Sequence, residues 1–267
     1  SSVAWLCSRS DTGKTSARLY IRGFPMLSDV RAICFDLDDT FWEVRPVLQR
    51  AEARMAAFLQ EQHPVLGARF APEDLYARRM SLVQERPDRA HDMTWLRIEA
   101  LRRFALEHEH DPTIADEAFA VFIDARHDVT FFEDVLPALE RLSGRYPLAT
   151  FSNGNADIHR IGIGGHFVVT LNAEKVGHAK PKPEAFRAVA DSLGLRPDQI
   201  LYVGDEPRLD VMGSRAAGCR SAWINRRAMP WPAELTPAAD LEVSDLLELV
   251  DWLDESTTTG SQSRHPE

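Results

Sequence analysis

The chain has 267 residues, of which 44% are hydrophobic, and its formal net charge at pH 7 is −10. This length and composition suit one sizeable core with a smaller second module, and the negative charge argues against nucleic acid or an anionic membrane as the main partner. No apolar run approaches the length of a membrane span, and the three cysteines show no CxxC spacing. We therefore expect a cytoplasmic protein with reduced thiols, a monomer or homodimer, that binds a small molecule.

The two ends of the chain differ in composition from the rest. Residues 1–25 mix Ser, Thr, Arg and Gly without periodicity, which predicts a disordered extension, with Met26 as the expected native start. Gly13-Lys14-Thr15 resembles the end of a phosphate-binding loop, but Ser8 stands where that motif needs glycine and no strand precedes it. Residues 255–267 are polar and rich in Ser and Thr, which predicts a disordered tail.

The first predicted strand ends in a pair of carboxylates. Residues 33–35 are apolar and predict a short buried parallel strand, which Asp36, Asp38 and Thr40 follow. Side chains at the carboxyl end of such a strand project into the crevice where ligands bind. Two carboxylates there repel each other unless a cation or a proton lies between them, so the pattern indicates a divalent metal with a nucleophile and an acid. The alternative is an acidic turn capped by Asp39.

A long helical stretch follows the acidic motif. Apolar residues at helical spacing predict helices over residues 46–62, 72–85, 92–109 and 112–128. We expect a small bundle over residues 45–131, whose aromatic residues belong more often to a bundle core than to a ligand site. Because this insert leaves the sheet just after the first strand, it is expected to overhang the strand ends as a lid.

The remainder alternates strands with helices. Strands are predicted at residues 147–151, 167–171, 200–203 and 220–224. Helices are predicted at 135–142, at 183–193 with Gly194 as the stop, at 207–217, and at 244–253 with Ser244 as N-cap. This alternation predicts an α/β fold with a doubly wound parallel sheet, whose core domain comprises residues 26–44 and 132–254.

Polar residues of four segments are expected to meet at one edge of this sheet. Besides Asp36 and Asp38, they are Ser152-Asn153-Gly154 after the second strand, Lys180 before a helix, and Asp205 after a later strand. Each has a structural alternative: Ser152 and Asn153 as helix caps, Lys180 as a solvated side chain, Asp205 as an N-cap. All of these would have to coincide in the right order, which favours a common site.

The chemistry of these groups suits a phosphate ester, whose hydrolysis depends on positioning and charge neutralisation. Asp36, Asp205 and the backbone carbonyl of Asp38 are hard oxygen ligands consistent with Mg²⁺. Ser152 and the backbone amides of the Asn153-Gly154 turn can donate to phosphate oxygens, and Lys180 supplies a positive charge. An aspartate can act as nucleophile, and a second carboxyl can protonate the leaving alcohol and then activate water.

Four motifs together carry a family resemblance. Asp-x-Asp-x-Thr at residues 36–40, a hydroxyl after the second strand, Lys-Pro-x-Pro at 180–183 and Gly-Asp-x4-Asp at 204–210 resemble the haloacid dehalogenase-like hydrolase superfamily over residues 28–253. The resemblance implies a Rossmann-like core with a helical C1 cap. It implies that Asp36 is the nucleophile and Asp38 the general acid/base, that Ser152 and Lys180 bind phosphate, and that Asp205 and Asp210 serve the metal. Dehalogenases of this superfamily lack the second aspartate, so its presence favours a phosphatase.

A narrower resemblance concerns the substrate. Residues 45–47, 91–97, 152–156 and 219–224 resemble the bacterial flavin-pathway phosphatases, which act on flavin mononucleotide and on a phosphorylated ribitylaminouracil precursor. We predict that Trp95 stacks on a flat heterocycle while His91 or Asp92 binds ribityl hydroxyls. The alternative is that Trp95 belongs to the core of the insert and that His91 and Asp92 cap a helix.

The sequence therefore predicts a magnesium-dependent phosphomonoesterase of the riboflavin pathway that forms an aspartyl-phosphate intermediate. Its substrate is expected to be 5-amino-6-(5-phospho-D-ribitylamino)uracil or flavin mononucleotide. One alternative is a phosphosugar phosphatase or mutase with the same groups. A second is a catalytically silent binding protein, which the loss of Asp36 or Asp38 would mark, and neither residue is lost.

Overall fold

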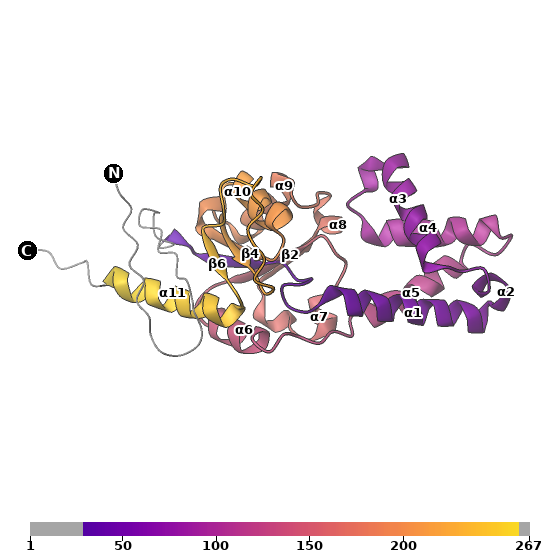
Figure 1. Ribbon diagram of the computed structural model, residues 1–267, viewed down its shortest axis with the longest axis horizontal. Helices are drawn as coiled ribbons and strands as arrows, with labels where there is room; N and C mark the ends of the chain where they lie inside the picture. The colour runs from indigo at the N-terminus through magenta and orange to yellow at the C-terminus, as the bar shows by residue number, and fades with distance from the viewer. Residues whose placement is uncertain (1–28, 262–267) are drawn as a thin grey trace, which may run out of the picture.

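A six-stranded parallel sheet forms the centre of the larger part of the molecule (Figure 1). The computed structural model describes the backbone of residues 29–261 and the side chains of residues 29–255. The strand order is β3-β2-β1-β4-β5-β6, which confirms the predicted doubly wound α/β fold. The strands are β1 (Ala32–Phe35), β2 (Leu148–Ser152), β3 (Val169–Asn172), β4 (Ile200–Gly204), β5 (Arg220–Ile224) and β6 (Leu241–Val243).

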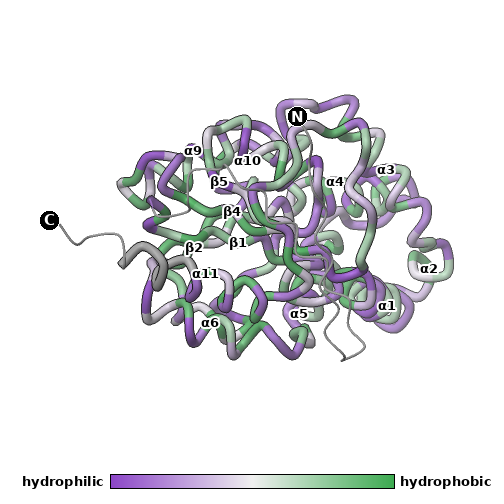
Figure 2. The backbone as a smooth tube through the Cα atoms, turned by 60° about the vertical axis from the view of Figure 1, so that its left-hand side comes forward, coloured by the Kyte–Doolittle hydropathy of each residue, from purple (hydrophilic) through white to green (hydrophobic). Residues whose placement is uncertain are grey.

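The central strands are buried on both faces, as their apolar sequences predict. Alternate side chains of β1 point to opposite faces, with Ile33 and Phe35 in one cluster and Cys34 in the other. Helices α6 (Val135–Ser143), α7 (Ile158–Ile161) and α11 (Leu246–Ser261) cover the first face. Helix α9 (Pro183–Leu193) covers the second face, and Figure 2 shows the hydrophobic strands enclosed between these layers.

Five helices between β1 and β2 form a second hydrophobic cluster of their own, at one end of the molecule in Figure 1. They are α1 (Val44–Gln62), α2 (Pro64–Gly67), α3 (Pro72–Glu85), α4 (Met93–Glu107) and α5 (Ile114–Arg126). We call residues 44–126 the helical insert. Its core contains Met55, Leu82 and Phe122, so the insert buries its own apolar faces and does not depend on the sheet to cover them.

The register of the sheet places the predicted site residues. Phe35 at the end of β1 pairs with Thr150 of β2 and with Val203 of β4. The backbone amide of Asp36 then donates to the carbonyl of Val203 at 2.9 Å, so the strand pairing continues one residue further. The polar residues that follow these three strands therefore emerge at the same edge of the sheet.

Several predicted elements need correction. The predicted helix over residues 207–217 is a π-helical segment, Pro207–Met212, followed by the short α10 (Gly213–Ala216). In the π-helical segment Asp210 accepts a hydrogen bond from the amide of Glu206 at 2.9 Å, an arrangement that turns its carboxylate inward. Such segments are frequent at functional sites. The edge strand β6 was not predicted, because three residues are too few to show a periodic pattern.

The last helix also differs from its prediction at both ends. The carboxylate of Asp245 accepts from the amide of Glu248 at 2.8 Å, so Asp245 caps the helix that begins at Leu246, and the prediction of Ser244 as N-cap is wrong. Ser244 instead donates its amide and hydroxyl to the Glu248 carboxylate, both at 2.8 Å. The helix continues to Ser261, because extending an existing helix costs little.

The prediction for residues 1–25 lies outside the described residues, and so does the rest of the predicted tail. No helix in the described part of the chain has the length and apolar character needed to cross a membrane. Cys34 is buried in the sheet core as a free thiol.

Candidate active site

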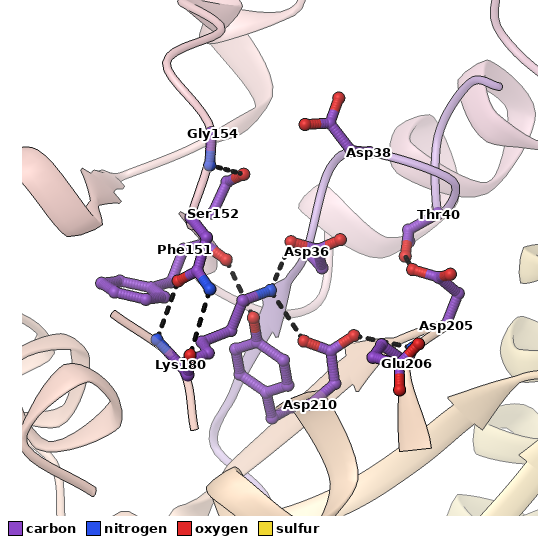
Figure 3. A network of polar contacts seen from close by, with 12 residues as sticks. Asp36, Asp38, Thr40, Phe151, Ser152, Gly154, Lys180, Asp205, Glu206 and Asp210 are labelled. Carbon is purple, nitrogen blue, oxygen red and sulfur yellow. Dashed lines mark hydrogen bonds and ion pairs between the residues drawn. The ribbon is translucent and has the colours of Figure 1, made fainter. Parts of the chain in front are cut away.

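Three aspartates from two strand ends form a carboxylate cluster at the predicted edge of the sheet (Figure 3). Asp36 follows β1, Asp205 follows β4, and Asp210 lies in the π-helical segment, and their nearest carboxylate oxygens all lie within 4.8 Å of one another. Asp36 and Asp210 are buried, and Asp205 is half-buried. A side chain at Gly204 would collide with Asp210, since an added Cβ would lie 2.3 Å from its Oδ2. The glycine therefore lets the carboxylate approach the strand end.

Lys180 is the cation of this cluster. Its Nζ lies 2.5 Å from Oδ1 of Asp36 and 2.7 Å from Oδ1 of Asp210. Burial alone would lower the pKa of Lys180, but attraction to Asp210 and Asp36 outweighs it, so the pKa rises above its usual range. Lys180 is therefore positively charged at neutral pH and positioned at the predicted nucleophile.

The carboxylates carry more negative charge than one ammonium group can balance. Burial, together with the negative charge of Asp210, raises the pKa of Asp36 to about 7. Burial, together with the charges of Asp36 and Asp210, raises the pKa of Asp205 to about 8. Either protons or a further cation must reduce this repulsion. Three carboxylates with excess negative charge are the hard oxygen donors that Mg²⁺ prefers, so the residues present fit a divalent cation.

The loop after β2 positions Lys180 through its backbone. The Asn153 side chain accepts from the amide of Lys180 at 2.8 Å and donates to its carbonyl at 3.1 Å. The hydroxyl of Ser152 accepts from the amide of Gly154 at 3.0 Å. The Asn153 side chain thus holds Lys180 in place, a role that sequence reasoning did not predict. The phosphate-binding roles predicted for Ser152, Asn153 and Gly154 stay predictions.

Asp38 stands apart from the carboxylate cluster, as Figure 3 shows. Its Oδ1 accepts from Nε1 of Trp42 at 2.9 Å and from Nη2 of Arg126 at 2.5 Å. The side chain is partly exposed, whereas Arg126 is buried. An added Cβ at Gly154 would lie 2.7 Å from Oδ2 of Asp38, so this carboxylate faces the loop predicted to bind phosphate. Its geometry separates Asp38 from the other acids, which suits a distinct proton-transfer role.

Trp42, Arg126 and Arg226 are residues of the site that sequence reasoning missed. Arg226 donates to the backbone carbonyl of Thr40 at 2.8 Å and forms a bidentate pair with Asp134 at 2.9 Å. Thr40 in turn donates to Asp205 at 3.4 Å. The only sequence signal for Arg126 is an arginine within a predicted amphipathic helix. Its partner, Asp38, lies 88 residues away in the sequence.

The residues predicted to bind the substrate lie at the start of α4. Asp92 accepts from the amide of Trp95 at 2.8 Å and is the N-cap of the helix, as the structural alternative expected. Two guanidinium groups lie near the Trp95 ring, with the Cζ of Arg86 at 5.6 Å and that of Arg89 at 5.1 Å from its centroid. Trp95 also packs against the core of the insert, and a role for it or for His91 in binding stays a prediction.

This end of the insert contacts the site loop of the core. Asn155, which follows the Ser152-Asn153-Gly154 turn, donates to the hydroxyl of Thr94 at 3.3 Å. Thr94 is the second residue of α4. The start of α4 is therefore adjacent to the loop that holds Lys180, although its side chains do not belong to the carboxylate cluster.

Comparison with known proteins places this arrangement in a family. A sequence profile of the haloacid dehalogenase-like hydrolases matches residues 30–218. The chain is 30% identical over 237 residues to the 5-amino-6-(5-phospho-D-ribitylamino)uracil phosphatase YigB of Escherichia coli K12, spanning 86% of this chain and 98% of that protein. It is 27% identical to the glyceraldehyde 3-phosphate phosphatase of Methanopyrus kandleri, spanning 81% of this chain and 91% of that protein.

A solved structure is similar over the same extent. The 2-haloacid dehalogenase from Pseudomonas syringae pv. tomato DC3000 matches with a TM-score of 0.80 at 34% identity, covering 85% of this chain and 99% of that chain. These matches confirm the predicted resemblance to the superfamily and to a flavin-pathway phosphatase. Since the profile covers most of the chain and its motifs meet at one edge of a parallel sheet, the protein belongs to the haloacid dehalogenase-like hydrolase family.

Proposed function

We propose that this hydrolase is a magnesium-dependent phosphomonoesterase that acts on a small phosphorylated metabolite through an aspartyl-phosphate on Asp36. The observation that carries the proposal is the carboxylate cluster around Lys180, with the Asp38 carboxylate standing separately beside it. A cation-binding cluster suits a substrate rich in negative charge, and a separate carboxylate suits an alcohol leaving group, which must be protonated as it departs.

In the proposed first step, an oxygen of Asp36 attacks phosphorus and the bond to the ester oxygen breaks. Asp38 in its protonated form gives its proton to that oxygen, and the alcohol leaves. Lys180 and the Ser152 hydroxyl neutralise and orient the phosphoryl oxygens. In the second step, Asp38 takes a proton from water as the water attacks the phosphoryl group, and Asp36 is released as a carboxylate with inorganic phosphate as product.

Asp36, Asp205, Asp210 and the backbone carbonyl of Asp38 would hold Mg²⁺. When bound, the cation supplies positive charge to a phosphate oxygen and to the nucleophile. This is consistent with the pKa values of Asp36 and Asp205, which repulsion and burial raise to about 7 and about 8 in the absence of a cation.

Dehalogenation of a 2-haloacid is the second candidate, because the 34% identical relative carries that name. A halide leaves as a stable anion and needs no proton, so Asp38 would have no acid role in that reaction. A carboxylate cluster that fits Mg²⁺ also suits a phosphate ester, whose hydrolysis depends on charge neutralisation, more than it suits the displacement of a halide. Both features favour the phosphatase.

The finer proposal concerns the substrate and rests on the 30% identical relative named for a ribitylaminouracil phosphate. We propose 5-amino-6-(5-phospho-D-ribitylamino)uracil or flavin mononucleotide as substrate, with the helical insert as a cap over the site. The contact between Asn155 of the core and Thr94 of α4 supports this, since it brings the insert next to the loop that holds Lys180.

The test is a phosphate-release screen over phosphorylated metabolites, with halide release from 2-haloacids measured in parallel. Magnesium-dependent phosphate release that chelator removes, and that calcium restores poorly, is expected. Halide release without phosphate release would replace the phosphatase by the dehalogenase, and full activity in excess chelator would remove the metal from the proposal. Transfer of phosphate to a second substrate hydroxyl would identify a mutase.

A further inference from the structure

Three arginines are buried in the helical insert on three different helices. Arg79 of α3, Arg97 of α4 and Arg126 at the end of α5 are 8%, 4% and 1% exposed. Buried charges are costly unless they are paired, so each of these groups requires a partner. We call these three residues the arginine cluster.

The carboxylates available to the arginine cluster are too few. Arg97 and Arg79 share Oε1 of Glu52, at 3.4 and 4.0 Å, and Arg126 pairs with Asp38 at 2.5 Å. Among the described residues these are the only ion pairs of the cluster, so one positive charge remains in excess. Nε of Arg79 and Nη1 of Arg126 are buried, and neither has a hydrogen-bond partner within the same part of the chain. The shared oxygen and the unpartnered donors both indicate a missing acceptor.

The three guanidinium groups act on one another. The Cζ of Arg97 lies 3.7 Å from the centroid of the Phe122 ring, one helical turn before Arg126. Burial, together with the positive charges of Arg79 and Arg126, lowers the pKa of Arg97 to about 9. Arg79 and Arg97 are thus joined through Glu52, and Arg97 packs on a ring one helical turn from Arg126.

The arginine cluster begins at the candidate active site. Nη2 of Arg126 would lie 3.6 Å from a Cβ added at Gly154, in the loop predicted to bind phosphate. The side chains of Asp38 and Glu52, which pair with the two ends of the cluster, are 23% and 29% exposed. Each end of the cluster therefore lies beside a partly exposed carboxylate, and the cluster extends from the site into the insert.

We propose that the arginine cluster binds the part of the substrate that lies beyond the ester oxygen, and that this part carries a planar group with two oxygen acceptors, a carboxylate or an imide. The inference rests on the proposed function, since it places the phosphate in the core and the acceptor group in the insert. One guanidinium group presents two parallel donors that match a carboxylate in a bidentate manner, and separate guanidinium groups can each donate to one of the two carbonyl oxygens of an imide. An acceptor there completes the hydrogen bonding of Arg79 and Arg126 and balances the excess charge.

The test compares the full-length chain with two matched variants. Arg79→Met removes the charge at nearly constant length. Arg78→Met is the control: Nε of Arg78 is also buried without a partner among the residues that the structure describes, but the Arg78 side chain is 28% exposed and has its own carboxylate, Glu107 at 2.5 Å, outside the cluster. Each protein is assayed with two substrate pairs. Flavin mononucleotide against ribitol 5-phosphate tests the imide, and 3-phosphoglycerate against glycerol 3-phosphate tests the carboxylate.

The wild type and Arg78→Met are expected to favour the acceptor-bearing member of one pair in kcat/KM by about ten-fold or more. The pair that shows this preference identifies the acceptor. Arg79→Met is expected to lose most of it. A wild type without preference in either pair, or an Arg79→Met variant that keeps the preference, overturns the proposal.

Melting temperatures separate this proposal from the proposed function. Without substrate, Arg79→Met is expected to melt at or above the wild-type temperature, because it removes an uncompensated buried charge. In the wild type, flavin mononucleotide should raise the melting temperature more than ribitol 5-phosphate does, or 3-phosphoglycerate more than glycerol 3-phosphate does. This difference between the two members of a pair should vanish in Arg79→Met. Ligand-dependent shifts without any phosphate release would refute the phosphatase and retain the subsite. A lower melting temperature of Arg79→Met, or equal shifts within both pairs, would refute the subsite.

Discussion

Nη2 of Arg126, the last residue of α5, donates to Oδ1 of Asp38 at 2.5 Å, so the helical insert directly contacts the proposed acid/base of the core. Trp42, in the segment that leads from β1 to α1, donates to the same oxygen at 2.9 Å. The position of Asp38 therefore depends on how the insert packs against the core.

Replacing Arg126 with Met should impair proton transfer by Asp38. With only Trp42 left as a donor, Asp38 is positioned less well, and a displacement of about 1 Å can cost about 100-fold in rate. The turnover of alkyl phosphates, whose leaving groups need a proton, is expected to fall more than that of nitrophenyl phosphate. Single-turnover rates with both substrates test this, and an equal loss on both would show that Arg126 does not act through Asp38.

Asp36→Asn should abolish turnover while keeping the fold. The amide is a poor nucleophile, and Lys180 keeps its other partner, Asp210, at 2.7 Å. Asp39→Asn is the matched control, because its retained Oδ1 can still accept from the amide of Val44 at 3.0 Å. Phosphate release and circular dichroism are measured for both. Near-wild-type release from Asp36→Asn would remove it as the nucleophile.

The carboxylate cluster predicts how stability depends on pH and on magnesium. The folded state raises the pKa of Asp36 to about 7 and that of Asp205 to about 8, whereas unfolded aspartates titrate near about 4. Between pH of about 4 and about 8, the folded chain therefore binds more protons than the unfolded chain. The contribution of these two carboxyl groups to the free energy of unfolding is therefore lost as the pH rises through this range. Magnesium competes with these protons and should therefore stabilise the chain more at pH 8 than at pH 6.

Melting temperatures at the two pH values, with and without magnesium, measure this effect. Asp205→Asn serves as the control, since it removes one of the raised carboxyl groups, and its magnesium-dependent shift should be smaller. A magnesium shift that is the same at both pH values in the wild type would show that the cation does not displace protons from this cluster.

The positions of Asp36, Ser152 and Asp205 could be predicted because parallel strands present their carboxyl ends at one edge of a sheet. The pattern of buried strands determined that edge, and the structure brings Asp36, Asp205 and Asp210 together there. The prediction required only the order of strands and the residue after each one.

The contacts of Arg126 and Asn153 could not be predicted in this way. Arg126 meets Asp38 across 88 residues, through the packing angle of the insert, and no local pattern encodes that angle. Asn153 was expected only at the phosphate, yet its side chain binds the backbone of Lys180, 27 residues away. Both contacts depend on how segments far apart in the sequence approach each other. The hydrophobic periodicity of a single segment does not determine that approach.

Asn153→Ala should lower kcat through Lys180. The variant loses the two hydrogen bonds, at 2.8 and 3.1 Å, that fix the Lys180 backbone beside the nucleophile, and a loss of about ten-fold is expected. Asn155→Ala is the control, since it removes only the contact with Thr94. Steady-state kinetics on one phosphate ester distinguish them, and equal rates for the two variants would show that Asn153 has no special role.

Trp95→Ala tests whether the insert recognises a flat heterocycle. The guanidinium groups of Arg86 and Arg89 lie near this ring, at 5.6 and 5.1 Å from its centroid, and Asp92 caps α4. A heterocycle that stacks on this ring would gain dispersion and the nearby positive charge. The variant is expected to raise KM for flavin mononucleotide by about ten-fold, which corresponds to about 1.4 kcal/mol.

Nitrophenyl phosphate should be turned over almost normally by the same variant, because this small compound does not extend to the start of α4. Equal losses on both substrates would indicate that Trp95 supports the fold of the insert, as its packing against that core allows. No loss on either would place recognition elsewhere in the insert. Only a loss confined to flavin mononucleotide supports stacking, because a fold defect affects every substrate that uses Asp36 and Lys180.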